Sequence, residues 1–285
     1  MSQTTTTATE VAPADDPFYY GWRYVSRMHR ENGEEWEETV QVPLTYNDML
    51  HPEEGDIVTH TPLHHRICAY LVAVIETWAR SQPRLVVVLS DVRIEWDMPD
   101  LQAHGPDVAV IFGVRERQNW GTFSVAQEGV RPALIIEVTS PKTRKGDLVD
   151  KVDEYALAGV PLYVIVDFVQ RRNILVTRLL GYQLVNDVYQ SLALNEDGWL
   201  WLEPIRLWIG IEDNQLVCYD EHRNALLDYS DLAAAHVEAE AATHAQALAR
   251  AEAEARAKAE AQSRAEAEER LRELEAELRR LRGEA

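Results

Sequence analysis

One acidic residue inside an apolar run constrains this chain more than any other feature. Residues 134–138, LIIEV, are apolar apart from Glu137 and form the kind of short run expected of a strand covered on both faces. Acidic side chains are almost never fully buried unless they are paired. A loop crowded with hydroxyls and lysines follows directly. We therefore expect a functional role for Glu137, the simpler alternative being a solvent-facing acid at a strand end.

A second carboxylate stands beside a neighbouring apolar strand. In PDVAVIF, residues 106–112, Asp107 opens a run rich in β-branched residues. Phosphodiester hydrolysis needs an attacking water, neutralised phosphate charge and a stabilised leaving oxygen, and Mg²⁺ serves all three. Mg²⁺ favours carboxylate oxygen, so Asp107 and Glu137 are predicted to bind Mg²⁺, or Mn²⁺ in its place, with the Val138 carbonyl as third ligand. Alternatively, Asp107 only caps a turn after Pro106.

A lysine at the start of the next predicted helix completes this set. Lys151 would orient or deprotonate the attacking water and offset phosphate charge. A solvated lysine paired with Asp147, four residues earlier, is the simpler alternative. Asp147 itself is expected to cap the helix N-terminus. Asp107, Glu137 and Lys151 are thus the predicted catalytic residues.

The order of predicted elements indicates an α/β domain with a mixed central sheet. Apolar spacing predicts an amphipathic helix within residues 60–82, with Pro62 in its first turn. A second helix is predicted from Asp147 to Gly159. Strands are predicted within 84–96, 107–112, 134–138, 163–168 and 173–220, the last range with Gly181 and Asp197-Gly198 as turn signals. Residues 18–50 receive no assignment.

The composition changes sharply near residue 230, to Ala, Glu and Arg. Leu271, Leu274, Leu278 and Leu281 are spaced three, four and three, which is a heptad seam. We expect a long helix over 229–285 that forms a coiled coil and joins two copies of the chain, the alternative being a single solvated helix. Before it, residues 1–17 are expected to be a disordered leader and 18–228 the folded domain.

Net charge and cysteine content exclude several classes of protein. A net charge of −20 argues against a protein that coats nucleic acid through a broad basic surface. A local basic patch remains near the two acids, formed by Arg131, Lys142, Arg144, Lys145 and Lys151. Only Cys68 and Cys218 are present, so a disulfide framework and a cysteine zinc site are not expected. No signal peptide or membrane span is recognisable, and we expect a cytoplasmic protein.

The segment around Glu137 also resembles a known family. The likeness is carried by PDVAV at 106–110 and by Glu137, Ser140, Pro141, Thr143, Asp147, Lys151, Tyr155, Gly159, Val160, Pro161, Tyr163 and Asp167. Their order and spacing resemble the Uma2 family of restriction-endonuclease-like proteins, within the PD-(D/E)xK nuclease superfamily, over residues 40 to 220 or so. The resemblance implies a restriction-endonuclease-like mixed sheet flanked by helices, a metal held by Asp107 and Glu137, and DNA as substrate.

One position departs from the superfamily pattern. The lysine expected two residues after the glutamate is absent, because Thr139 stands there. The resemblance implies that Lys151 supplies this amine from the helix instead. If Lys151 points elsewhere, no residue fills the water-activating role.

Polar neighbours of Glu137 are the predicted substrate contacts. They are Ser140, Lys142, Thr143, Arg144, Lys145 and Tyr155. Ser140 and Thr143 either bind phosphate or shape the loop. Tyr155 and Tyr163 are otherwise expected to be packing residues with hydroxyls in water, and Asp167 to form a turn.

The first predicted helix offers further candidates. His64 or His65 would contact substrate from its start, and Glu76 would add an acid to the metal site. For all three, a structural or exposed position is the expected alternative.

Three functions fit these residues. The leading one is a Mg²⁺-dependent DNA endonuclease. The second is a catalytically weak or inactive binding and assembly module, favoured by the acidity of the domain and the missing lysine at Thr139. The third is a metal-dependent hydrolase of another phosphate ester, because the residues describe the chemistry and not the substrate.

Overall fold

The computed structural model describes residues 16–32, 34–171 and 174–226, together with separate residues between 241 and 278. The chain divides into two units, Met1–Asp228 and Tyr229–Ala285. Most of the predicted leader, 1–17, lies outside the described residues. No helix in the described part of the chain is both long and apolar enough to cross a membrane.

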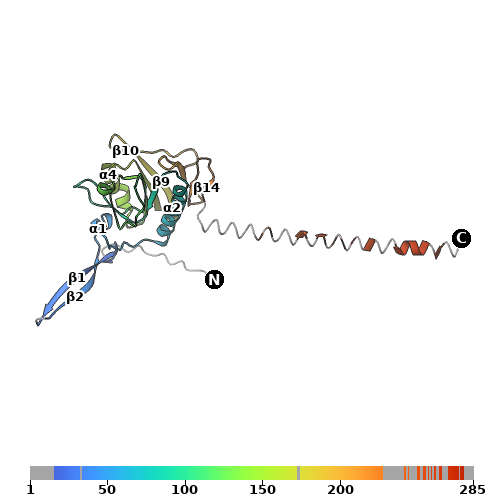
Figure 1. The fold of residues 1–285 in the computed structure, drawn as a ribbon, viewed down its shortest axis with the longest axis horizontal. Coiled ribbons are helices and arrows are strands. Elements are labelled where there is room, and N and C mark those ends of the chain that lie inside the picture. Colours follow the sequence, from blue (N-terminus) through green and yellow to red (C-terminus); the bar gives the residue numbers. More distant parts are fainter. Residues whose placement is uncertain are drawn as a thin grey trace. The chain divides into compact units, whose positions relative to one another are not determined.

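A six-stranded mixed sheet forms the centre of the first unit (Figure 1). Its strands lie in the order β10 (Val188–Ser191), β9 (Ile174–Val185), β8 (Leu162–Arg171), β7 (Pro132–Val138), β5 (Val108–Phe112) and β3 (Val86–Leu89). β7 and β8 run parallel, whereas the other neighbouring pairs are antiparallel. The predicted α/β architecture with a mixed central sheet is confirmed.

Each face of this sheet has its own apolar core, because side chains alternate along a strand. On one face, Leu134 and Ile136 pack with Leu71 and Ile75 of helix α2 (Pro62–Arg80). On the other, the core includes Val87, Ala109, Ile135 and Ile165, together with Tyr155 of helix α4 (Lys151–Leu157) and Ala158 at its end. Glu137 follows the alternation of Ile135, so its side chain points to the face that α4 covers.

The first long helix forms as predicted. α2 (Pro62–Arg80) has Pro62 in its first turn, and Thr61 caps it by accepting a hydrogen bond from the His64 N–H. Two short helices also occur. α1 (Tyr46–Leu50) begins at a capping box formed by Thr45 and Asp48, and α3 (Val125–Glu128) ends at Gly129.

The second helix differs from the prediction at its start. A turn of π-helix, η1 (Gly146–Asp150), precedes α4 (Lys151–Leu157), and Asp147 makes no capping bond. The capping role predicted for Asp147 is wrong, because its carboxylate is buried and pairs with Lys151 instead. Gly159 ends the helix with a φ of 72°, as predicted.

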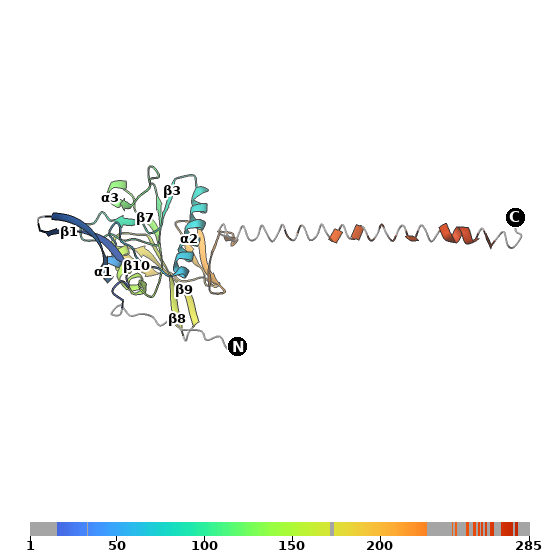
Figure 2. The same ribbon diagram turned by 90° about the horizontal axis from the view of Figure 1, so that it is seen from below.

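Smaller sheets surround the central one (Figure 2). Residues 18–50, left unassigned above, contain the hairpin β1 (Trp22–Glu31) and β2 (Glu34–Pro43). The other sheets are β4 (Arg93–Glu95) with β6 (Thr122–Ser124), and β11 (Leu200–Leu202), β12 (Leu207–Glu212), β13 (Gln215–Tyr219) and β14 (Ala225–Leu226).

Two of the predicted turn positions behave differently. Gly198 has a φ of 79° and forms a turn as expected. Gly181 lies inside β9, paired with Val164, so the turn predicted there is wrong. A Cβ at Gly181 would meet the Leu200 side chain at 2.6 Å, which explains the glycine by close packing.

The described residues of the second unit are helical, including 269–275. Leu271, Leu274 and Leu278 are exposed there, at 59%, 54% and 48%. Leu281 lies outside the described residues, as does much of the helix predicted over 229–285. The coiled coil therefore stays a prediction.

Candidate functional site

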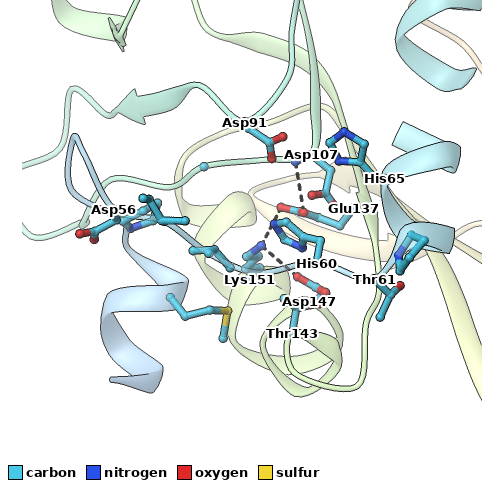
Figure 3. Close-up of a pocket in the computed structure, with 16 residues that line it drawn as sticks. Asp56, His60, Thr61, His65, Asp91, Asp107, Glu137, Thr143, Asp147 and Lys151 are labelled. Carbon is cyan, nitrogen blue, oxygen red and sulfur yellow. Dashed lines mark hydrogen bonds and ion pairs between the residues drawn. The ribbon is translucent and has the colours of Figure 1, made fainter. Parts of the chain in front are cut away.

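A cleft of about 580 Å³ opens between α1, the start of α2 and the η1–α4 segment. Its lining includes the acids Asp56, Asp91, Asp107, Glu137 and Asp147, the histidines His60 and His65, and Lys151 (Figure 3). The structure thus brings all three predicted catalytic residues to one cavity.

Strand pairing places Asp107 and Glu137 against each other. β5 and β7 are antiparallel, with Val108 opposite Ile136. The Val138 N–H donates to Asp107 Oδ2 at 2.7 Å, and the Asp107 N–H donates to Glu137 Oε2 at 3.4 Å. Both side chains are buried. Each carboxylate is therefore fixed by the backbone of the neighbouring strand.

Lys151 points into this cluster. Its Nζ lies 2.9 Å from Glu137 Oε1 and 2.9 Å from Asp147 Oδ1, and the residue is only 5% exposed. Burial alone would lower the pKa of Lys151, but Asp147, Glu137 and Asp107 outweigh burial and raise it. The solvated lysine considered above is excluded, whereas its pairing with Asp147 is present.

The buried acids outnumber the cations that balance them. Burial, with the charges of Asp107 and Asp147, raises the pKa of Glu137 well above its usual range despite Lys151. Burial also raises the pKa of Asp147. For Asp107 the burial effect is exceeded by His64 and Lys151, so its pKa is lowered. Such a set of oxygen atoms is short of positive charge.

Asp91 adds a fifth acid at the rim of the cleft. It follows β3 in a left-handed conformation, with a φ of 53°. Surrounding protein and the charge of Asp107 raise the pKa of Asp91 to about 6. Sequence analysis missed Asp91, because a Ser-Asp pair between two strands is typical of an ordinary turn.

His64 contacts one of the predicted metal ligands. Its Nε2 lies 3.2 Å from Asp107 Oδ1. Burial lowers its pKa, but Asp107 and Val138 outweigh burial and raise it. A ring nitrogen of His64 therefore faces the Asp107 carboxylate. Because the carboxylates of Asp107 and Glu137 are hard oxygen donors that line one cleft, the residues fit Mg²⁺ or Mn²⁺.

His64 also has neighbours that sequence analysis did not connect with it. The ring of His60 stacks on it, with centroids 4.1 Å apart, and His60 lines the cleft. Cys68, one turn further along α2, completes a set with His64 and Asp107 whose ligand atoms lie within 4.8 Å of one another. The spacing H64-x₃-C68 on α2, with His60 just before the helix, is the signal that could have indicated this group.

Two buried tyrosines donate hydrogen bonds to the acidic residues of the cleft. The Tyr155 hydroxyl donates to Glu137 Oε1 at 2.8 Å, and the Tyr163 hydroxyl donates to the Asp147 carbonyl at 2.8 Å. Both residues are fully buried, so the prediction that their hydroxyls face water is wrong. The period of α4 had placed Tyr155 on the Lys151 face, and that placement is correct.

Three residues of the predicted basic patch contact other protein groups and do not reach the cleft. Lys142 donates to Thr59 Oγ1 at 2.5 Å, and Lys145 lies 5.1 Å from the ring centroid of Tyr46. Arg144 pairs with Asp167 at 2.7 Å. None of the three lines the cleft. Cationic contact with a substrate inside the cleft therefore falls to Lys151.

Of the other predicted positions, some line the cleft and some do not. Thr143 lines the cleft, whereas Ser140 does not, and the two hydroxyls contact each other at 3.2 Å. Glu76 pairs with Arg80 at 3.2 Å on α2 and is not part of the cleft.

Asp167 is wrongly predicted as a turn residue. It lies within β8, fully buried, and accepts hydrogen bonds from Arg144, Arg178 and Thr139. Thr139 stands where the superfamily lysine was expected. Its hydroxyl is taken up by Asp167 and the Phe168 N–H, away from Glu137.

A second cluster lies beside the first, around Glu154 of α4, and the Tyr155 side chain contacts both. The ligand atoms of His51, His104 and Glu154 lie within 4.8 Å of one another. Trp96 donates its indole N–H to His104 Nδ1 at 2.8 Å, so Nε2 carries the proton and donates to Glu154 Oε2 at 2.7 Å. With both ring nitrogens committed, His104 has no lone pair for a metal. This cluster is a hydrogen-bond network.

Comparison with known proteins adds a family to this geometry. A family model described as "Uma2: Putative restriction endonuclease" matches residues 34–211. The chain belongs to the Uma2 family. A solved structure described as "a putative nuclease belonging to DUF820", from Anabaena variabilis, is similar over 57% of this chain and 91% of that one, with 16% identity and a TM-score of 0.39. No curated protein matches this Uma2 chain.

Proposed function

We propose that this Uma2 protein is a Mg²⁺-dependent DNA endonuclease that cleaves phosphodiester bonds in the cleft around Glu137, with Mn²⁺ as an alternative metal. One observation carries the proposal: Asp107, Glu137 and Lys151 meet in a single cleft where buried acids exceed buried cations. The nuclease description of the family supports the reaction class.

The proposed metal ligands are the carboxylates of Asp107 and Glu137 and the carbonyl of Val138. When bound there, Mg²⁺ supplies a Lewis acid for the phosphate oxygen and lowers the pKa of an attacking water. His64 Nε2, 3.2 Å from Asp107 Oδ1, would compete with a bound cation for that oxygen.

Lys151 has two tasks in this proposal. Its ammonium, 2.9 Å from Glu137 Oε1, fixes the orientation of that carboxylate together with the Tyr155 hydroxyl. It also lines the cleft and offsets charge on a bound phosphate. Because its pKa is raised, it acts as a fixed cation rather than as the base that removes the water proton.

We infer that the C-terminal segment joins two copies of the chain. Leu271, Leu274 and Leu278 are exposed on described helical residues and continue the heptad seam. The free thiols of Cys68 and Cys218, both buried, fit a reducing cytoplasm.

A second candidate is a binding module with little or no activity. Lys142, Arg144 and Lys145 lie outside the cleft, which favours this candidate, because an acidic cavity with Lys151 as the one lysine or arginine of its described lining attracts a phosphate backbone weakly.

Plasmid nicking separates the two functions. Supercoiled plasmid is incubated with the full chain and Mg²⁺ or Mn²⁺, beside Glu137→Ala and the matched surface variant Glu76→Ala. The endonuclease predicts nicking that Glu137→Ala reduces at least about 100-fold and Glu76→Ala leaves intact. Nicking that survives Glu137→Ala would sink the proposed site, and no nicking with either metal would favour the binding module.

A further inference from the structure

The hairpin β1–β2, called the arm below, is exposed along most of its length. Its two ten-residue strands pair with each other and with no third strand in the described part of the chain. At the base, Trp22 forms a bridge with Ile57, and Arg23 pairs with Asp48, Glu53 and Asp56. Beyond that, the arm projects from the central sheet (Figure 1). Two-stranded ribbons are marginally stable alone in water, so this arm needs a surface to pack against.

Large apolar side chains remain open on the arm. Tyr24 is 60% exposed, Met28 68%, Trp36 45% and Val25 37%. Side chains alternate along a strand, so Tyr24 and Met28 lie on one face of the arm and Val25 and Trp36 on the other. Exposed apolar side chains gathered on one ribbon indicate an interaction surface. The arm is therefore a docking surface and not a simple loop.

One face of the arm combines apolar and charged pairs. Because opposite residues in an antiparallel pair share a face, this face carries the pairs Val25–Val40, Arg27–Glu38 and His29–Trp36. The His29 and Trp36 rings stack with centroids 5.4 Å apart. We call these six residues the arm face. It has an apolar end, a charged middle and an aromatic tip.

The two strands carry opposite charge. β1 contributes Arg23, Arg27 and Arg30, whereas β2 contributes Glu34, Glu35, Glu37 and Glu38. Arg27 has no ion pair among the described residues, while Glu38 contacts His29 at 2.8 Å. Charge on this arm is thus complementary to a second copy of itself.

Symmetry then selects one arrangement. If the arms paired edge to edge through the same strand of each copy, like charges would face each other. If β1 of one copy paired with β2 of the next, each copy would keep a free edge and an open filament would form. Stacking two arm faces about a twofold axis along the strands places β1 of each copy over β2 of the other. Val25 then meets the partner's Val40, and Arg27 meets the partner's Glu38.

We propose that the arm is a self-association surface, whose arm face binds the arm face of a second copy of this chain. The contact is separate from the cleft and from the C-terminal leucines. Neither the proposed nuclease activity nor the coiled coil is needed for it.

Charge exchange tests the contact in the full chain, with Leu271, Leu274 and Leu278 changed to Asn in every sample so that the proposed coiled coil does not hold the copies together. Arg27→Glu and Glu38→Arg are studied separately and mixed, by sedimentation over a range of concentrations, with far-UV circular dichroism to establish folding. Each variant alone sets like charges against each other twice in the symmetric contact, and we expect its association constant to fall about tenfold or more. In the mixture, the acids of the Arg27→Glu chain face the bases of the Glu38→Arg chain at both contacts, so wild-type association should return.

The control changes the same charge on the other face of the arm. Glu37→Arg neighbours Glu38 on β2 but points away from the arm face, so it should associate as wild type does. Wild-type sedimentation for both single variants, or no recovery on mixing, would overturn the proposal and leave the arm to a partner of other chemistry.

Cross-linking supplies a test that does not weaken the contact. A Val25→Cys chain mixed with a Val40→Cys chain should be joined by a short bis-maleimide, since the native Cys68 and Cys218 are buried. Gln41→Cys, which points to the other face of the arm, should cross-link less with either variant. Equal yields with Gln41→Cys and with the Val25→Cys and Val40→Cys pair would contradict the stacked arrangement.

Discussion

Two neighbouring buried polar clusters along helix α4 differ in how their charges are balanced. Lys151 enters the first, with Glu137 and Asp147, and Glu154 enters the second, with His104 and His51. In the second, Trp96 and the Ala103 carbonyl complete the hydrogen bonds of the histidines. The first has more carboxylates than cations and opens to the cleft. A cluster whose hydrogen bonds and charges are all balanced by protein groups is structural. A cluster with more carboxylates than cations is suited to bind a cation.

The largest expected effect on stability comes from removing Lys151, which pairs with both Glu137 and Asp147 in the first cluster. Lys151→Met leaves Glu137 and Asp147 buried without their partner, and we expect a loss of about 3–5 kcal/mol in the free energy of unfolding. Urea unfolding at pH 7.5 measures it, with exposed Lys145→Met as a control that loses about 1 kcal/mol or less. Added Mn²⁺ should recover part of the loss. An unchanged Lys151→Met protein would contradict the charge balance described above.

The second cluster should respond to acid instead. Burial lowers the pKa of His104 to about 4 from an ordinary 6.5. The imidazole of His104 therefore binds a proton more tightly in the unfolded chain than in the folded one. The contribution of neutral His104 to the free energy of unfolding is full above pH 6.5 and is lost as the pH falls towards 4. Glu154, whose pKa is lowered by His104 against the effect of burial, acts in the same direction.

His104→Gln tests this acid sensitivity. We expect the wild type to lose at most about 3 kcal/mol through this ring between pH 7 and pH 4, and the variant to lack that part of the slope. Urea unfolding at both pH values measures it, beside the exposed control His222→Gln. Parallel curves for wild type and His104→Gln would show that the ring is not the acid-sensitive group.

The smallest effect concerns the hydroxyl beneath Glu137. Tyr155→Phe keeps the packed ring and removes one hydrogen bond to a carboxylate, for a loss of about 1–2 kcal/mol. It should also change metal affinity a few-fold, because Glu137 loses a fixed neighbour. Tyr189→Phe removes a comparable bond to the Val160 carbonyl and should leave metal affinity unaltered. Equal metal affinities in Tyr155→Phe and Tyr189→Phe would show that the Tyr155 hydroxyl does not influence the metal site.

The sequence predicted the parts of the site that depend on local pattern. Apolar runs located β5 and β7, and the acids just before the first and inside the second identified Asp107 and Glu137. The helical period placed Lys151 near Asp147 and Tyr155. These inferences need only neighbours along the chain or on the next strand.

The rest depended on contacts between distant segments. His64 meets Asp107 across 43 positions of sequence, and His104 meets Glu154 across 50. Asp147 resembled a helix cap because a π-turn leaves no mark in residue spacing. Arg144 and Lys142 resembled a phosphate-binding patch until Asp167 and Thr59 were seen to engage them. Side-chain direction in a loop is set by tertiary partners that spacing does not reveal.

Calorimetric titration of Mg²⁺ and Mn²⁺ into the full chain tests the central claim most directly. Glu137→Gln and Glu154→Gln remove one negative charge from the first and the second cluster, respectively. The metal site proposed here predicts binding by wild type and by Glu154→Gln, and affinity at least about 100-fold weaker in Glu137→Gln. Wild-type affinity in Glu137→Gln, or loss of binding only in Glu154→Gln, would contradict it.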